Sequence, residues 1–226
     1  MPIALTQLNT DEVLRYMGCP PDRADPATRT LAEECGAELL RAVRPRWVWR
    51  VEELTPENSG LRLGCGLLLP GQDLKNHLKD CRRAAIFCAT LGAEADLLIR
   101  RAEGCRDMAR ALALDCAATA AVEALCDQIE LELQSRFPGC SFPFRYSPGY
   151  GDLPLEVQGS LLTLLDAQRR AGLTATSSHI LVPRKSVTAI FGVADGPIER
   201  HQRSCLGCSA RESCHYRKAG GHCGIS

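Results

Sequence analysis

Ten residues near the middle of the chain constrain the fold more than any other stretch. Residues 145–154 read Arg-Tyr-Ser-Pro-Gly-Tyr-Gly-Asp-Leu-Pro, with one arginine, two aromatic rings, two glycines and two prolines. Glycine permits backbone angles that other residues avoid, and proline fixes φ and lacks an amide donor. The stretch therefore predicts a loop of set shape, in which Arg145 is suited to bind a carboxylate through two hydrogen bonds. The alternative is an ordinary tight connection with a surface arginine.

Hydrophobic periodicity on both sides of this loop predicts an alternation of helices and strands. The expected helices begin at Thr10, with Thr10 as N-cap, and at Pro26, and the others cover residues 72–81, 93–102, 106–136 and 154–170. The expected strands cover residues 46–51, 61–69 (interrupted by glycines), 84–91, 180–182 and 186–193. This order favours an α+β fold with a mixed or antiparallel twisted sheet packed by helices. We divide the chain into an N-terminal region (1–83) packed on a core (84–195), followed by a Cys-rich tail (196–226).

Bulk composition excludes several classes of partner and location. Lysine and arginine (27) balance aspartate and glutamate (27), so nothing indicates a nucleic-acid or membrane partner held by net charge. The N-terminus has no secretion signal and no apolar run is long enough to span a membrane, which predicts a cytoplasmic protein. Thirteen cysteines, an odd number, include Cys88, Cys116 and Cys126 in apolar surroundings. They indicate buried thiols in a reducing compartment rather than a disulfide framework.

A polar stripe runs along the longest predicted helix, where Asp115, Thr119, Glu123 and Asp127 follow one another every four residues. Such spacing places them on one face, and successive members rise about 6 Å along the axis. For Asp115 and Asp127 we favour a solvated helix face.

The hexapeptide Arg145-Tyr146-Ser147-Pro148-Gly149-Tyr150 resembles the Arg-x-x-x-Gly-Tyr signature of the S-adenosylmethionine-binding activation domain of cobalamin-dependent methionine synthase. A downstream segment also matches that domain in its internal spacing, through Thr176, Ser178, Pro183, Ser186 and Val187. Ala121-Val122-Glu123-Ala124 is similar to part of the domain's long helix. The resemblance covers residues 84 to 195.

The resemblance implies a site for S-adenosylmethionine. Glu123 would contact an ammonium or another donor on the ligand, and Arg145 its carboxylate. Backbone groups around Ser147, Gly149 and Tyr150 would contact the adenine or line the methyl side. The family has an aromatic pair where this chain has Phe191 and Gly192. Phe191 keeps an aromatic ring but has no hydroxyl, and Gly192 has no ring. Ser177 stands where the family has an acidic residue.

The resemblance also implies a role in methionine biosynthesis, as an accessory component of a methyltransferase. The chain would support reductive remethylation of the inactive cob(II)alamin of a methionine synthase that lacks its own activation domain. That partner would supply the cobalamin, S-adenosylmethionine the methyl group, and an electron donor the electron. No catalytic side chain is required. The alternative is a non-catalytic, zinc-stabilised interaction module that docks on a corrinoid protein.

The C-terminal tail carries a second candidate site. Cys205, Cys208, Cys214 and Cys223 lie within nineteen residues, with three histidines among them. A four-cysteine iron–sulfur cluster tolerates such irregular spacing and could deliver the electron. A zinc site is the alternative, although zinc ribbons usually have two Cys-x2-Cys pairs and only one is present. A thiol-rich tail without metal is the third possibility.

Overall fold

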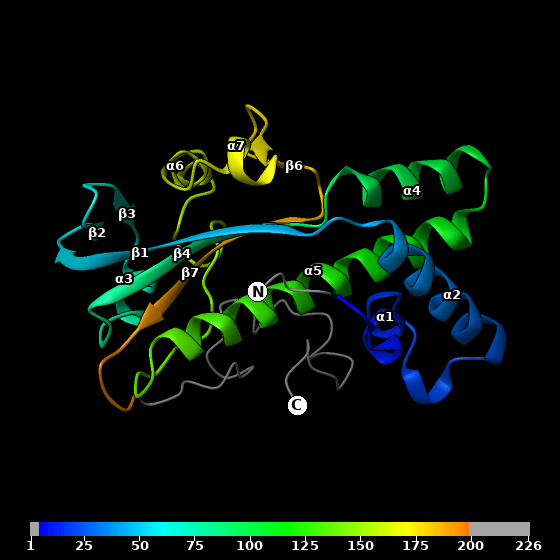
Figure 1. The fold of residues 1–226 in the computed structure, drawn as a ribbon, viewed down its shortest axis with the longest axis horizontal. Helices are drawn as coiled ribbons and strands as arrows, with labels where there is room; N and C mark the ends of the chain where they lie inside the picture. Colours follow the sequence, from blue (N-terminus) through cyan, green and yellow to red (C-terminus); the bar gives the residue numbers. More distant parts are fainter. Residues whose placement is uncertain (1–4, 199–226) are drawn as a thin grey trace.

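A five-stranded antiparallel sheet forms the centre of the computed structural model, which describes residues 5–198 (Figure 1). Its strand order is β3-β2-β1-β4-β7, and each neighbouring pair is antiparallel. The strands are β1 (Arg46–Glu57), β2 (Gly60–Leu63), β3 (Leu68–Pro70), β4 (Arg83–Thr90) and β7 (Ser186–Val193). A separate two-stranded sheet joins β5 (Thr174–Ala175) to β6 (Leu181–Val182). The expected α+β fold is confirmed, with an antiparallel sheet.

Strand β4 lies between β1 and β7 and is buried from Ala84 to Thr90. Its side chains alternate between the two faces of the sheet, as strand geometry requires. On one face, the side chains of Ala85, Phe87 and Ala89 pack in a core with the long helix α5 (Met108–Arg136). On the other face, Ile86 and Cys88 pack in a second core with α6 (Val157–Leu164) and α7 (Ala167–Ala171). The continuous apolar run predicted as a buried strand is therefore confirmed, because both faces of β4 are covered.

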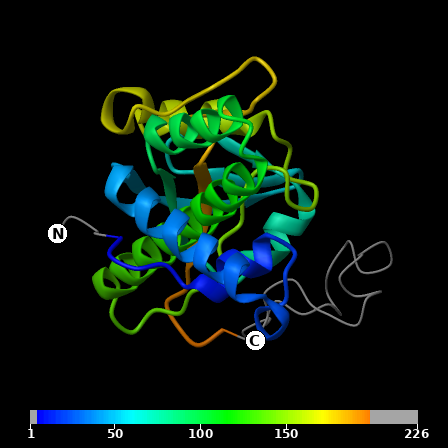
Figure 2. The ribbon, with the colours of Figure 1, turned by 90° about the vertical axis from the view of Figure 1, so that its right-hand side faces the viewer.

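Helices cover both faces of the sheet. Figure 1 shows α6 and α7 on one side and α5 on the other. Figure 2 shows the N-terminal helices α1 (Thr10–Tyr16) and α2 (Pro26–Ala42) on the side of α5, against which both pack. The remaining helices are η1 (Pro21–Arg23), α3 (Gln72–His77) and α4 (Ala93–Gly104). Because α5 buries mostly alanines along its middle, its backbone lies close to these neighbours.

Several predicted boundaries were wrong for identifiable reasons. The helix expected over 154–170 is two helices, because Asp166 has a positive φ of 51° between them. Residues 154–156 form a turn, with a hydrogen bond from the amide of Gln158 to the carbonyl of Leu155. The N-cap of α1 is Asn9 rather than Thr10, since its side-chain oxygen accepts from the Asp11 amide at 2.9 Å.

Two more elements are shorter or longer than expected. Strand β1 extends to Glu57 and turns into β2 as a hairpin, so the first strand is longer than the six residues predicted. Helix α3 ends at His77, where a turn replaces the last predicted residues. Among the described residues, no helix has both the length and the apolar character needed to cross a membrane.

Candidate functional site

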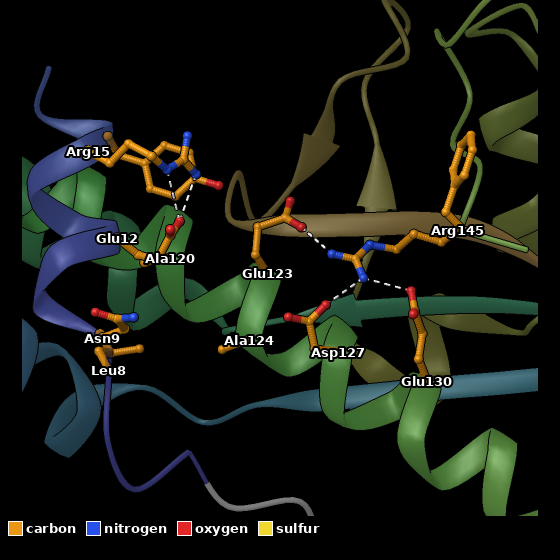
Figure 3. A pocket seen from close by; sticks show the side chains of 12 residues that line it. Leu8, Asn9, Glu12, Arg15, Ala120, Glu123, Ala124, Asp127, Glu130 and Arg145 are labelled. Carbon is orange, nitrogen blue, oxygen red and sulfur yellow. Dashed lines mark hydrogen bonds and ion pairs between the residues drawn. The ribbon is translucent and has the colours of Figure 1, made fainter. Parts of the chain in front are cut away.

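The loop over residues 145–154 is docked on the sheet at its first residues. Tyr146 and Ile190 of β7 exchange two backbone hydrogen bonds, at 2.9 and 2.7 Å. This bridge fixes the backbone at Tyr146, so the neighbouring Arg145 side chain is directed away from β7 and toward α5 (Figure 3).

The rest of the loop is held by its own backbone. The amide of Gly149 donates to the carbonyl of Leu153 at 2.9 Å, and the amide of Tyr150 donates to that of Ser147 at 3.0 Å. Gly149 has a φ of +90°, and a Cβ there would come within 2.8 Å of the Leu155 side chain. A residue other than glycine would therefore be both strained and crowded at this position. The loop has the set shape that its glycines and prolines predicted.

The far end of the loop is anchored on α3 through Asp152. One carboxylate oxygen accepts from the Gln72 amide at 2.6 Å and the other from the Asp73 amide at 3.1 Å. These two amides belong to the first turn of α3, where backbone donors have no partner within the helix. Asp152 therefore caps a helix nearly eighty residues earlier in the chain and holds the loop against it.

Aromatic side chains pack under the loop. His77 lies with its ring centroid 4.1 Å from that of Phe144 and 5.3 Å from that of Tyr146. Tyr146 in turn meets Tyr150 edge-on at 5.9 Å. Burial, with the nearby charges of Asp73 and Asp152, raises the pKa of Tyr146 to about 12, so its hydroxyl stays protonated at neutral pH. The ring of Tyr150 is about half exposed and lies at the surface of the loop.

Three carboxylates of α5 surround the guanidinium of Arg145 (Figure 3). Nη1 donates to Asp127 at 2.7 Å and to Glu130 at 2.6 Å, and Nη2 donates to Glu123. The three acids are spaced four and three residues apart, which places them on one face of the helix. Burial lowers the pKa of Arg145, but the charge and hydrogen bonds of Glu130 and Asp127 outweigh that effect and raise it. Arg145 is therefore permanently charged although it is 9% exposed.

A cleft of about 560 Å³ opens beside this cluster, between α1 and α5. Figure 3 shows α1 on one side of the cleft and the Arg145 cluster on the other. The lining residues are Leu8, Asn9, Glu12, Arg15, Tyr16, Ala120, Glu123, Ala124, Asp127, Glu130, Phe144 and Arg145. The first five come from α1 and the residues just before it, and the next five from α5.

The α1 wall of the cleft has its own ion pair. Arg15 pairs with Glu12 at 2.7 Å, and its guanidinium carbon lies 4.3 Å from the centroid of the Tyr16 ring. Burial, together with the charge of Glu123, raises the pKa of Tyr16. Tyr16 therefore contacts the cation of α1, and its hydroxyl is affected by the charge of a carboxylate of α5.

The predicted site residues fall into three groups. Glu123 and Arg145 are brought together and both line the cleft. Ser147, Gly149 and Tyr150 lie in the loop that follows Arg145, outside the lining of the cleft. Phe191 is fully buried in the core and stacks on Phe142 at 5.1 Å.

Gly192 has a packing role in the structure. A Cβ at this position would come within 2.6 Å of both Cys81 and Leu78. The aromatic ring that the resembling family has on this strand would therefore not fit at Gly192 in the observed packing. Phe191 and Gly192 both lie within β7, away from the cleft lining.

Sequence reasoning missed part of the cluster. Asp127 and Asp115 were interpreted as a solvated helix face. Asp127 is exposed as predicted, with 66% of its side chain accessible, but it also pairs with Arg145. Asp115 is half-buried and pairs with Lys185 at 2.9 Å. Glu130 was not singled out, although its spacing from Glu123 and Asp127 continues the same helical face. The contribution of Glu12 and Arg15 from α1 depends on tertiary packing, and nothing in the sequence signals it.

The candidate metal ligands Cys205, Cys208, Cys214 and Cys223 lie outside the described residues. Within residues 5–198, no group of three or more histidine, cysteine, aspartate or glutamate side chains is arranged to hold a metal ion. The nine cysteines of this range are free thiols.

Comparisons with known proteins identify the fold. No protein-family model matches the sequence, and no curated protein matches it either. Among solved structures, the MetH reactivation domain bound to AdoHcy superposes with a TM-score of 0.60 at 14% sequence identity. The match covers 95% of this chain and 82% of that chain. The chain therefore has the fold of the MetH reactivation domain, as the loop motif predicted.

Proposed function

We propose that this chain binds S-adenosylmethionine in the cleft between α1 and α5 and supports reductive remethylation of the corrinoid of a cobalamin-dependent methionine synthase. The observation that carries the proposal is the position of Arg145. The first residue of the loop motif enters the wall of a cleft whose volume, about 560 Å³, lies in the range of small-molecule sites. The solved domain of the same fold is bound to AdoHcy, the demethylated form of that ligand.

The charges around the cleft suit a cationic ligand. Four carboxylates line it, from Glu12, Glu123, Asp127 and Glu130, against two guanidinium groups. S-adenosylmethionine carries a sulfonium and an ammonium, and both are cations that a surplus of carboxylates attracts. Glu123 is suited to the ammonium, because its carboxylate is fixed by Arg145 and lines the cleft.

The chain's own contribution to the reaction is binding and orientation. It would hold the sulfonium methyl group toward the cobalt of the partner and keep water away from it. The transfer needs one electron and the methyl group, and it leaves a neutral thioether in the cleft. No general base is required, so the proposal assigns none. The partner is a methionine synthase that supplies the cobalamin.

Isothermal titration calorimetry with S-adenosylmethionine tests the binding step. We expect micromolar affinity for the unmodified chain and none for Arg145→Ala, which leaves three carboxylates without their cation. Glu123→Gln should weaken binding about tenfold, because one charged hydrogen bond is lost. Glu33→Gln, an exposed position on α2 away from the cleft, is the matched control and should bind normally. Absence of heat with the unmodified chain would contradict the proposal and favour a non-catalytic docking module.

We further propose that Cys205, Cys208, Cys214 and Cys223 bind a four-iron cluster that relays the electron. The support is the number and spacing of thiols, since cysteine thiolates are the usual ligands of such clusters. Anaerobic purification followed by visible absorption and electron paramagnetic resonance tests it. We expect a brown protein whose signal is lost in a chain ending at residue 198. A colourless, zinc-loaded protein would contradict it.

A further inference from the structure

The two arginines of the cleft have different surroundings. Arg145 is enclosed by three carboxylates and its side chain is 10% exposed. Arg15 is paired with one carboxylate within the described residues, that of Glu12, and its side chain is 27% exposed. Figure 3 shows them on opposite sides of Glu123, one on α1 and the other beyond α5.

Arg145 is poorly placed to bind an anion. Both of its terminal nitrogens already donate to carboxylates of α5. A ligand carboxylate that approached the guanidinium would meet three negative charges around one positive charge. The net interaction is repulsive, so the two-pronged clamp that the sequence suggested is already occupied by the protein's own acids.

Arg15 is the cation of the cleft that can accept an anion. Its Nε and Nη2 donate to the same oxygen of Glu12, at 3.1 and 2.7 Å, so a single carboxylate balances its charge. The guanidinium carbon lies over the Tyr16 ring, a contact that helps to hold the side chain in place, and Arg15 lines the cleft. Glu12 takes one donor from Nε and one from Nη2. A guanidinium has five N–H donors, and those left on Nη1 and Nη2 form a second fork that can bind a ligand carboxylate.

We infer that Arg15 binds the carboxylate at the amino-acid end of the ligand, while Arg145 is a positioning residue that fixes Glu123 for the neighbouring ammonium. The cleft would then recognise a zwitterion, with its anion against α1 and its cation against α5. This assignment rests on the proposed function, and it names the residue of α1 that the loop motif does not contain.

The test compares S-adenosylmethionine with its decarboxylated analogue, which keeps the sulfonium and the amine but lacks the carboxylate. Calorimetry on Arg15→Gln should show at least about a tenfold loss of affinity for S-adenosylmethionine, the size expected for one charged hydrogen-bond pair. Affinity for the decarboxylated analogue should stay within about twofold of the unmodified chain. Arg145→Gln should weaken both ligands by the same factor, because it disturbs Glu123 and not the carboxylate.

Two further variants keep the test decisive. Arg23→Gln changes an exposed arginine outside the cleft lining and should leave both affinities unchanged. Glu12→Gln removes the internal competitor of Arg15, so it should tighten S-adenosylmethionine severalfold without tightening the analogue. Circular dichroism and the thermal midpoint confirm that each variant is folded before titration.

The outcomes separate this inference from the proposed function. An equal loss for both ligands in Arg15→Gln, or a carboxylate-specific loss in Arg145→Gln, would overturn the assignment while binding itself stands. If the unmodified chain binds neither ligand, the proposed function fails and the assignment fails with it.

Discussion

At the scale of single residues, Arg145 holds together three carboxylates that would otherwise repel one another. Glu130 is its most buried partner, with 18% of the side chain exposed, whereas Asp127 is 66% exposed. Removing one member of a buried pair leaves the other charge uncompensated, which costs more than the pair contributes. The cluster therefore couples the shape of the cleft to the stability of the fold.

This coupling predicts the outcome of a double-mutant cycle. Arg145→Gln should lower the free energy of unfolding by about 3 kcal/mol, because the largely buried Glu130 then loses the ion pair with Arg145. Combining it with Glu130→Gln should recover about 1–2 kcal/mol, since the stranded charge is gone. Urea denaturation of the four proteins measures the coupling, and strictly additive effects would show that the ion pair is energetically unimportant.

A buried thiol makes stability depend on alkaline pH. Burial in β4 raises the pKa of Cys88 from 9.0 to about 11, against weaker opposing effects of the Val48 backbone and Arg170. The folded thiol thus keeps its proton up to about pH 11, while the unfolded chain releases it near pH 9. The unfolded state binds fewer protons in this window, so stability is full below pH 9 and falls as the pH rises.

The expected loss from Cys88 is roughly 2–3 kcal/mol between about pH 8 and about pH 11. Urea denaturation across this range should show a shallower pH dependence for Cys88→Ala than for the unmodified chain. The remaining slope comes from other buried thiols such as Cys81. Cys65→Ala changes an exposed thiol and should keep the full slope. Identical slopes in the Cys88 and Cys65 variants would contradict the account.

At the scale of elements, the site depends on α5 and on the loop that faces it. The helix provides three acids on one face, and the bridge between Tyr146 and Ile190 fixes the backbone next to Arg145. Asp152 fixes the other end of the loop on α3. The loop is thus held at both ends by elements that the sequence places far apart.

Replacing Asp152 should loosen the loop. Asp152→Ala removes the acceptor of two amides at the start of α3, so we expect a loss of about 1 kcal/mol in unfolding free energy. Affinity for S-adenosylmethionine should fall severalfold, because the loop carrying Arg145 is less fixed. Asp152→Asn keeps one acceptor and should lose less in both measurements. Asp80→Ala, at an exposed position after α3, is the control. Unchanged binding in Asp152→Ala would show that this anchor does not shape the site.

Elements were predictable from the sequence where one local signal decides them. The buried strand β4 and the long helix α5 follow from apolar runs and periodicity, and the loop follows from its glycines and prolines. The break between α6 and α7 was missed because Asp166 adopts a positive φ that its residue type permits but does not require. The end of α3 was missed because Leu78, Lys79 and Asp80 follow His77 without a glycine or proline to signal a stop.

At the scale of the whole molecule, the cleft arises where the N-terminal helix packs on the long one. Figures 1 and 2 show α1 beside α5, although about a hundred residues of chain separate them. Glu123 and Arg145 could be paired from the motif, because the resemblance supplied both. Arg15 and Glu12 could not be assigned to the site from the sequence, because their place in it depends on how α1 packs on α5. A motif therefore located one wall of the cleft, and the fold supplied the other.

The central claim is that a sulfonium nucleotide binds between these two walls. Hydrogen–deuterium exchange of the full chain, with and without saturating S-adenosylmethionine, tests it most directly. We predict slower exchange in peptides that cover α1 and residues 144–152, with no change in α4, which contributes no residue to the lining of the cleft. Protection confined to other segments, or no protection despite saturating ligand, would contradict the account.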